Sequence, residues 1–128
     1  MSNAKGFTLI ELMITVVIIS IISMIAIPQY GQYVIRGNRA AAEAFMMDVA
    51  NREKQYLLDA RSYAPDLPTL TMTAPTNVSK YYTITITPVA GPPPSYTITA
   101  TPVVGSKQAG DGTLTLDDLG NKGPTGKW

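Results

Sequence analysis

Residues 5–30 read KGFTLIELMITVVIISIISMIAIPQY, and this stretch decides how the rest of the chain is organised. Between Phe7 and Ile27 every side chain is apolar except for two threonines, two serines and Glu11. A run of about 20 apolar residues is long enough to cross a bilayer as a helix. A carboxylate inside such a run costs about 3 kcal/mol on insertion, so Glu11 indicates a functional role that requires a partner of opposite charge.

Two ordinary explanations fit this stretch poorly. A secretory signal peptide has a basic start, a short apolar core and a small-residue cleavage site after that core. Here the apolar core is too long, and the following IAIPQYGQY lacks that small-residue pattern. A plain membrane anchor explains the length of the run but not its glutamate.

The segment KGFTLIE at residues 5–11 resembles the prepilin processing motif of type IV pilins and related pseudopilins. In that family a short basic leader ends in glycine, an aromatic residue follows, and glutamate is the fifth residue after the cleavage point. The resemblance implies cleavage between Gly6 and Phe7 and N-methylation of Phe7. It also implies that Glu11 meets the N-terminal amine of a neighbouring subunit during filament assembly. An ion pair between the two groups offsets the free-energy cost of burying either charge alone in apolar surroundings.

Beyond the apolar run the sequence returns to helical spacing. Pro28 lacks a backbone N–H and clashes with the preceding turn, so it predicts a kink, with a helix end as the alternative. An apolar stripe follows at the α-helical period, formed by Ala42, Phe45, Met46, Val49 and Tyr56. The opposite side carries charged residues among alanines, namely Arg39, Glu43, Arg52 and Lys54. We therefore expect one helix from about residue 7 to Ala60, kinked near Pro28, which lies where pilins also have a proline.

Three segments with period-2 alternation predict strands, at residues 81–87, 96–102 and 113–117. In each strand one face carries Tyr, Ile, Ala or Leu and the other face is largely threonine. The proline-rich residues 88–95 should form the hairpin loop between the first two strands, and residues 61–80 read as a loop region. The expected fold class is α+β, with the long N-terminal helix packed on a small antiparallel sheet, as in the type IV pilin fold.

The composition excludes most catalytic machinery. The chain of 128 residues has no cysteine and no histidine, so thiol nucleophiles, Ser-His-Asp triads and Cys-ligated zinc are impossible. The formal net charge of +1 argues against a globally basic nucleic-acid binder, but not against a local basic patch. We expect no enzymatic activity and no cofactor.

The remainder of the chain resembles the PilE-like minor pilins. The similar segments are YYTITI, YTITATP, GTLTLDDLGNKG and the terminal Trp128. Those relatives commonly carry two cysteines that close the C-terminal loop, at the positions where this chain has Asp111 and Lys127. We expect packing and hydrogen bonds to hold the loop here, with Trp128 as an apolar anchor.

Two ligand hypotheses remain open in the C-terminal half. One hypothesis is a calcium site like that of secretion pseudopilins, formed by Asp111, Asp117 and Asp118. Their spacing differs from that of an EF-hand loop, and a turn explains these residues more simply. The lysines of this half could form a basic stripe for DNA, or a scattered solvated surface, which we favour. They are Lys80, Lys107, Lys122 and Lys127.

The resemblance implies a leader at residues 1–6, a membrane-spanning and filament-core segment at 7–30, and a globular domain at 31–128. The expected function is that of a pilus subunit supporting adhesion, twitching motility or DNA uptake. Its partners would be like subunits, other pilins, the prepilin peptidase and N-methyltransferase, the assembly platform and membrane lipid. It would sit in the inner membrane with a periplasmic domain, then in an extracellular pilus. The alternatives are a type II secretion pseudopilin, or a minor pilin that binds DNA or a receptor.

Overall fold

A computed structural model describes residues 6–128 and has the expected α+β architecture. Helix α1 spans Leu9–Ala60 without interruption, close to the predicted limits. The expected leader falls outside the described residues except for Gly6. The residues up to Val34 form one compact unit, and Ile35–Trp128 form a second.

In the second unit α1 buries the predicted apolar stripe. Ala42, Met46 and Val49 have no exposed surface, and Phe45 is buried beside them. Tyr56, the last predicted member, is half-buried and packs against this core. The 3.6-residue period therefore identified the buried face of the helix correctly.

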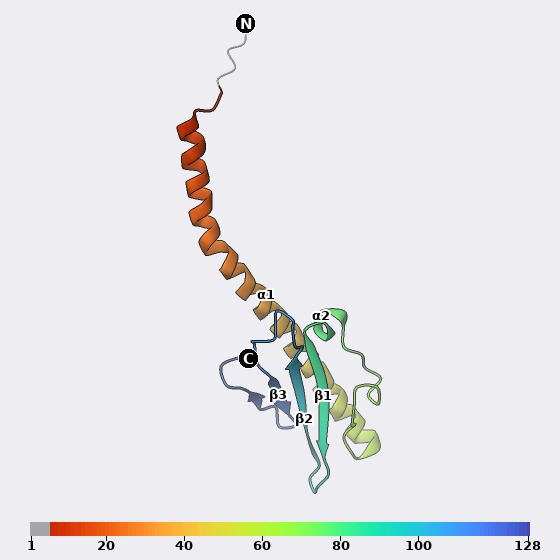
Figure 1. The fold of residues 1–128 in the computed structure, drawn as a ribbon. Coiled ribbons are helices and arrows are strands. Elements are labelled where there is room, and N and C mark those ends of the chain that lie inside the picture. The colour runs from red at the N-terminus through yellow and green to blue at the C-terminus, as the bar shows by residue number, and fades with distance from the viewer. Residues whose placement is uncertain (1–5) are drawn as a thin grey trace. The chain divides into compact units, whose positions relative to one another are not determined.

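The four strands form one antiparallel sheet in the order β1-β2-β3-β4, beside the C-terminal part of α1 (Figure 1). Their limits are Tyr82–Val89 for β1, Ser95–Pro102 for β2, Leu114–Asp117 for β3 and Lys122–Gly123 for β4. The register pairs Ile86 with Ile98 and Ile98 with Leu116, so apolar side chains align across three strands.

The two faces of the sheet differ in side-chain composition and burial, as the alternation predicts. The apolar face of the sheet is buried against the helix stripe and is formed by Tyr82, Tyr96, Ile98, Ala100, Leu114 and Leu116. Threonines face threonines on the other side, in pairs such as Thr85–Thr99 and Thr99–Thr115. The threonines of β1 are exposed and those of β2 and β3 are mostly half-exposed.

Three local features differ from the sequence-based expectation. The hairpin loop is shorter, because Pro88 and Val89 continue β1 and pair with Tyr96 and Ser95. A proline is tolerated there because β1 is an edge strand, whose outer side needs no ladder donor. The short helix α2, Thr76–Ser79, lies inside the region expected to be a loop. Strand β4 was not predicted, because its two residues are too few to show the alternation of apolar and polar side chains.

Glu53 is a buried acid on α1 that the apolar pattern does not reveal. Its side chain has no exposed surface, and Oε2 accepts a hydrogen bond of 2.9 Å from the Ala64 backbone N–H. The other oxygen, Oε1, is buried and has no hydrogen-bond partner within residues 6–128. Burial raises the pKa of Glu53, and the Ala64 N–H opposes this only in part.

Replacing Glu53 with Gln should stabilise the fold increasingly as pH rises. A raised pKa means that stability is full below about pH 4.5, the ordinary value, and falls as pH rises towards the folded-state value. Gln keeps the carbonyl acceptor for Ala64 without taking a charge. Urea unfolding followed by the fluorescence of Trp128, the one tryptophan in the sequence, measures this difference.

The matched control is Glu53→Ala, which removes the acceptor for the Ala64 N–H. It should destabilise the fold by about 1–3 kcal/mol. A Gln variant whose stability relative to wild type is the same at pH 4 and pH 8 would contradict the assignment of Glu53 as a buried acid with a raised pKa.

Candidate functional site

Gly6 and Phe7 precede α1 in a short non-helical segment. Phe7 is 87% exposed, and Gly6 is exposed with open space where a Cβ would lie. Because the bond between them is in exposed, irregular chain, a processing enzyme could reach it in this geometry.

Glu11 lies in the first turn of α1, where it forms a capping box with Thr8. The Thr8 backbone N–H and hydroxyl both donate to Glu11 Oε2 at 2.9 Å. The Glu11 backbone N–H donates to the Thr8 hydroxyl oxygen at 3.2 Å. This reciprocal pair satisfies N–H groups that a helix start leaves without partners. The sequence Thr-Leu-Ile-Glu is the usual signal for such a cap, but the processing motif alone does not predict it.

The apolar half of α1 is long and hydrophobic enough to cross a membrane. An 18-residue window of the helix has a mean hydropathy of 2.7, and none of that window is buried. Two of its hydroxyl groups are satisfied within the helix, because Thr15 donates to the Glu11 carbonyl and Ser20 to the Val16 carbonyl, each at 2.7 Å. Such back-bonding lets a hydroxyl lie in apolar surroundings at low cost.

Pro28 lies inside α1, and the helix continues beyond it to Ala60. The alternative of a helix end at Pro28 is therefore wrong. Because proline has no N–H, the carbonyl four residues earlier lacks its usual helical donor. This makes the turn before Pro28 an intrinsically weak point of the helix.

Asp111 is the centre of a buried polar cluster in the unit Ile35–Trp128. Its carboxylate accepts hydrogen bonds from Arg39, whose Nε is 2.7 Å from Oδ2, and from the Tyr82 hydroxyl at 2.5 Å. Gln108 Nε2 donates to the same carboxylate at 3.0 Å and to the Ile35 carbonyl at 3.0 Å. The cluster thus connects α1, β1 and the loop before β3.

Asp111 also reaches the C-terminal tail. Lys127 Nζ lies 3.9 Å from Asp111 Oδ1, so the two residues for which the resemblance to PilE-like pilins implies cysteines lie close together. Trp128 is half-buried against the core and donates from Nε1 to the Gly123 carbonyl at 3.0 Å. Charge, hydrogen bonds and packing therefore hold the tail, as expected.

Arg39 and Gln108 are the members of this cluster that sequence reasoning missed. The helical period placed Arg39 on the charged, solvent-facing side of α1, and Gln108 had no motif around it. The side chain of Arg39 is instead 20% exposed and bound to Asp111. No local pattern reveals the cluster, because Arg39 and Asp111 are far apart in sequence.

Two of the three aspartates of the calcium hypothesis have separate roles. Asp111 binds Arg39, whereas Asp117 closes its own turn by accepting from the Asn121 backbone N–H at 2.7 Å and from its side-chain amide at 2.8 Å. Within the described residues, no group of three or more His, Cys, Asp or Glu side chains could hold a metal ion. The geometry gives the calcium hypothesis no support.

Three of the four lysines considered for a basic stripe contact different partners. Lys80 Nζ lies 5.8 Å from the centre of the Tyr81 ring, and Lys122 Nζ lies 4.9 Å from that of Trp128. Lys127 pairs with Asp111, whereas Lys107 is exposed. These contacts do not support the hypothesis that the lysines form a single basic stripe.

Comparison with known families and proteins agrees with this fold. Residues 28–115, more than half of the chain, match the family described as "Type IV minor pilin ComP, DNA uptake sequence receptor". The chain belongs to the type IV pilin family. Residues 1–27 match the prokaryotic N-terminal methylation motif, which covers the segment with Gly6, Phe7 and Glu11.

Curated relatives include pilus components of two bacteria. The chain is 35% identical over 83 residues to the type IV wide pilus major component PilA4 of Thermus thermophilus, covering 62% of this chain and 63% of the relative. It is 37% identical over 81 residues to the type IV major fimbrial protein FimA of Dichelobacter nodosus, covering 62% of this chain and 51% of the relative. The matched region is thus less than two thirds of either relative.

Replacing Asp111 with Asn should destabilise the second unit by about 2–3 kcal/mol at neutral pH. The Arg39 guanidinium, with help from Tyr82 and Gln108, lowers the pKa of Asp111 to about 2. A lowered pKa means that this stability is full above about pH 3.8 and is lost as pH falls towards 2. Urea unfolding between pH 2 and pH 7 measures it.

Lys127→Gln is the matched control, because Lys127 is the more exposed and distant partner of Asp111. It should change stability by less than about 1 kcal/mol. Equal losses for Asp111→Asn and Lys127→Gln would contradict the assignment of Arg39 as the main partner.

Proposed function

We propose that this chain is a structural subunit of a type IV pilus filament. One observation carries the proposal: an exposed apolar helical segment with a single carboxylate near its start, joined to a folded unit of the pilin family. Such a helix is compatible both with lipid and with a bundle of like helices, since both environments are apolar. The fimbrial and pilus relatives favour a surface filament over a secretion pseudopilus.

Processing is the first step of this proposal. Cleavage between Gly6 and Phe7 by the prepilin peptidase would remove the leader and expose the amine of Phe7, which is then N-methylated. The exposed, non-helical segment around this bond and the match to the methylation motif support the step. The mature chain would begin two residues before α1.

Assembly pairs two charges that are both costly in apolar surroundings. Glu11 binds Thr8 through Oε2 alone among the described residues, so Oε1 remains available for the Phe7 amine of a neighbouring subunit. The helix end also favours a negative group in its first turn. The weak turn before Pro28 would let the helix adjust as neighbouring helices pack.

The proposed location follows from the same segment. Residues 7–30 would hold the subunit in the inner membrane with residues 31–128 in the periplasm, until the assembly platform transfers it into an extracellular pilus. Before assembly the segment contacts lipid, and afterwards it contacts like subunits and other pilins.

Glu11→Ala should reduce incorporation into pili by more than tenfold without preventing processing. The Phe7 amine would then be buried without a partner, which costs about 3 kcal/mol or more. The measurement is the amount of subunit in sheared filaments relative to the membrane pool. Mass spectrometry of the membrane pool should still find Phe7 as the first residue.

Thr8→Val separates assembly from helix capping. This variant loses the hydroxyl that binds Glu11 but keeps the carboxylate, so filaments should largely persist. If Thr8→Val lowers incorporation as much as Glu11→Ala, the role of Glu11 is to start the helix. A first residue other than Phe7 would refute the processing step.

A second candidate function is DNA binding by a minor pilin. The observation that favours it is the family description, which names a DNA uptake sequence receptor and covers residues 28–115. DNA affinity depends mainly on contacts between cationic side chains and phosphates. Both Lys107 and Lys122 belong to the C-terminal half of this chain, and Lys107 lies within the matched range.

Neutralising Lys107 and Lys122 together, as Gln, should weaken binding of duplex DNA by the full chain in neutral detergent. If both lysines contact phosphates, the slope of log affinity against log salt should fall by about 2. Fluorescence anisotropy at several salt concentrations measures both quantities. Unchanged affinity and slope in the double variant would contradict a role for these lysines in DNA binding.

A further inference from the structure

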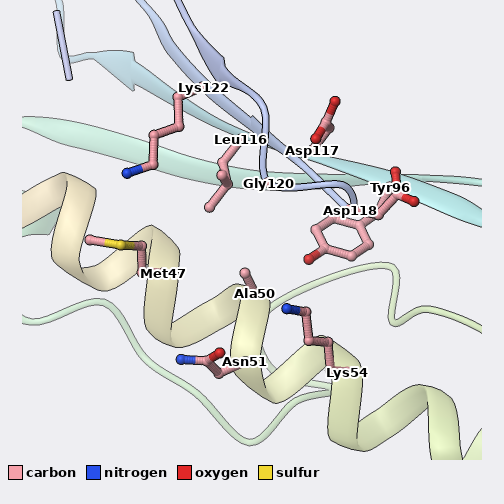
Figure 2. Close-up of a pocket in the computed structure, with 10 residues that line it drawn as sticks. All are labelled: Met47, Ala50, Asn51, Lys54, Tyr96, Leu116, Asp117, Asp118, Gly120 and Lys122. Atoms are coloured by element: carbon pink, nitrogen blue, oxygen red, sulfur yellow. The ribbon is translucent and has the colours of Figure 1, made fainter.

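A cavity of about 220 Å³ lies between α1 and the sheet, within the unit Ile35–Trp128 (Figure 2). Its apolar floor includes Ala50 of α1 and Leu116 of β3, which point towards each other across the space between helix and sheet. Met47, which is 42% exposed, lines the cavity, and Leu119, which is 81% exposed, lies in the turn that forms part of its wall. The volume is below the 300–1,000 Å³ typical of small-molecule pockets, so the cavity suits a single short side chain.

An exposed apolar side chain lies at the opposite end of the sheet. Val104 is 94% exposed and comes just after the last residue of β2, Pro102. The cavity instead adjoins Tyr96, near the start of the same strand. The two places are separated by most of the length of β2, about 20 Å. One copy of the chain therefore cannot place its own Val104 in its own cavity.

Val104 is presented by a fixed turn, residues 103–106, which we call the valine turn. The Val103 backbone N–H donates to the Tyr81 carbonyl at 2.9 Å, and the Ser106 hydroxyl donates to the Val103 carbonyl at 2.7 Å. Gly105 has a φ of +82°, a value that the third position of this kind of turn requires and that glycine adopts without strain. The side chain of Val104 is thus held outward before any contact forms, which lowers the entropic cost of docking.

The charges beside the two apolar sites are complementary. Lys107 is exposed and directly follows the valine turn. Asp118 is half-buried on the cavity lining, and the ion pairs among residues 6–128 do not include it. The two lysines of the lining do not oppose this match. Lys122 lies 4.9 Å from the centre of the Trp128 ring, and Lys54 is exposed, so its ammonium group can stay in water.

We propose that the valine turn of one copy docks into the cavity of a second copy, with Val104 on the apolar floor and Lys107 beside Asp118. The proposal rests on the proposed function as a filament subunit and names one contact between the folded units of two subunits. The contact joins two different surfaces, so each pair of copies still has one free valine turn and one free cavity. Repeating such a contact builds an open filament unless the rotation closes a ring.

Disulfide trapping tests the contact directly, because the chain has no cysteine. The double variant Val104→Cys/Met47→Cys places one thiol on the valine turn and the other at the cavity. A disulfide forms only when the two Cα atoms come within about 7 Å. Mild oxidation of sheared filaments should therefore produce a ladder of dimers, trimers and longer oligomers on a non-reducing gel.

Three controls accompany this variant. Val104→Cys alone and Met47→Cys alone should stay monomeric, because the contact does not bring like positions together. Val104→Cys/Leu58→Cys should also stay monomeric, since Leu58 is 83% exposed on α1 but lies outside the cavity. Crosslinking that stops at the dimer would indicate a twofold contact. Equal crosslinking through Leu58 and Met47 would indicate random collision, and either result would overturn the proposal.

Charge reversal tests the predicted pair between Lys107 and Asp118. Lys107→Glu and Asp118→Lys should each lower the amount of subunit recovered in sheared filaments by about threefold. The double variant should restore the wild-type amount, because it exchanges the two charges. Urea unfolding of Lys107→Glu should match that of wild type, since Lys107 is exposed. A double variant that recovers no better than the single variants would refute this pair.

The outcomes also separate this contact from the function on which it rests. If the wild-type chain is absent from filaments, the proposed function fails and the contact fails with it. If filaments contain the chain but oxidation of Val104→Cys/Met47→Cys leaves it monomeric, or joins it only to a different pilin, the function stands and the contact is wrong.

Discussion

The packing of one helical stripe against one face of the sheet is the constraint on which the unit Ile35–Trp128 depends. Ala42 on α1 and Ala100 on β2 are both fully buried, and small side chains of this kind let helix and sheet approach closely. Burying one larger side chain, such as Met46 or Ile98, contributes about 1.5–3 kcal/mol. Because this contact fixes the helix on the sheet, it also sets where the flanking residues Arg39 and Lys54 can reach.

Helix α1 meets two different requirements along one continuous element. Its early turns are exposed and apolar, with the hydroxyl groups of Thr15 and Ser20 bonded back to the helix, whereas its later turns supply the core of a folded unit. The polar groups of the two parts find their hydrogen-bond and ion-pair partners in different places. In the first they are satisfied locally, as in the cap made by Thr8 and Glu11. In the second they are satisfied across the fold, as between Arg39 and Asp111.

Most of the fold could be predicted from the sequence because its signals are periodic. The stripe from Ala42 to Val49 and the alternation in β1 to β3 are local patterns, and the structure confirms them. The buried Glu53 and the Arg39–Asp111 pair could not be predicted, because each depends on which distant backbone or charge arrives beside it. The N-terminal methylation motif could be recognised because its residues are contiguous, whereas cleavage after Gly6 stays a prediction.

The absence of cysteine determines how the C-terminal tail of this chain is closed. Closure of its tail through Asp111, Lys127 and Trp128 forms no covalent bond, so the chain consumes no oxidant and cannot form mispaired disulfides. Its closure therefore does not depend on the redox state of the surroundings. The Asp111 side chain of the ion pair at its centre is only 3% exposed and Arg39 is 20% exposed, so dissolved salt screens this pair less than a fully exposed surface pair.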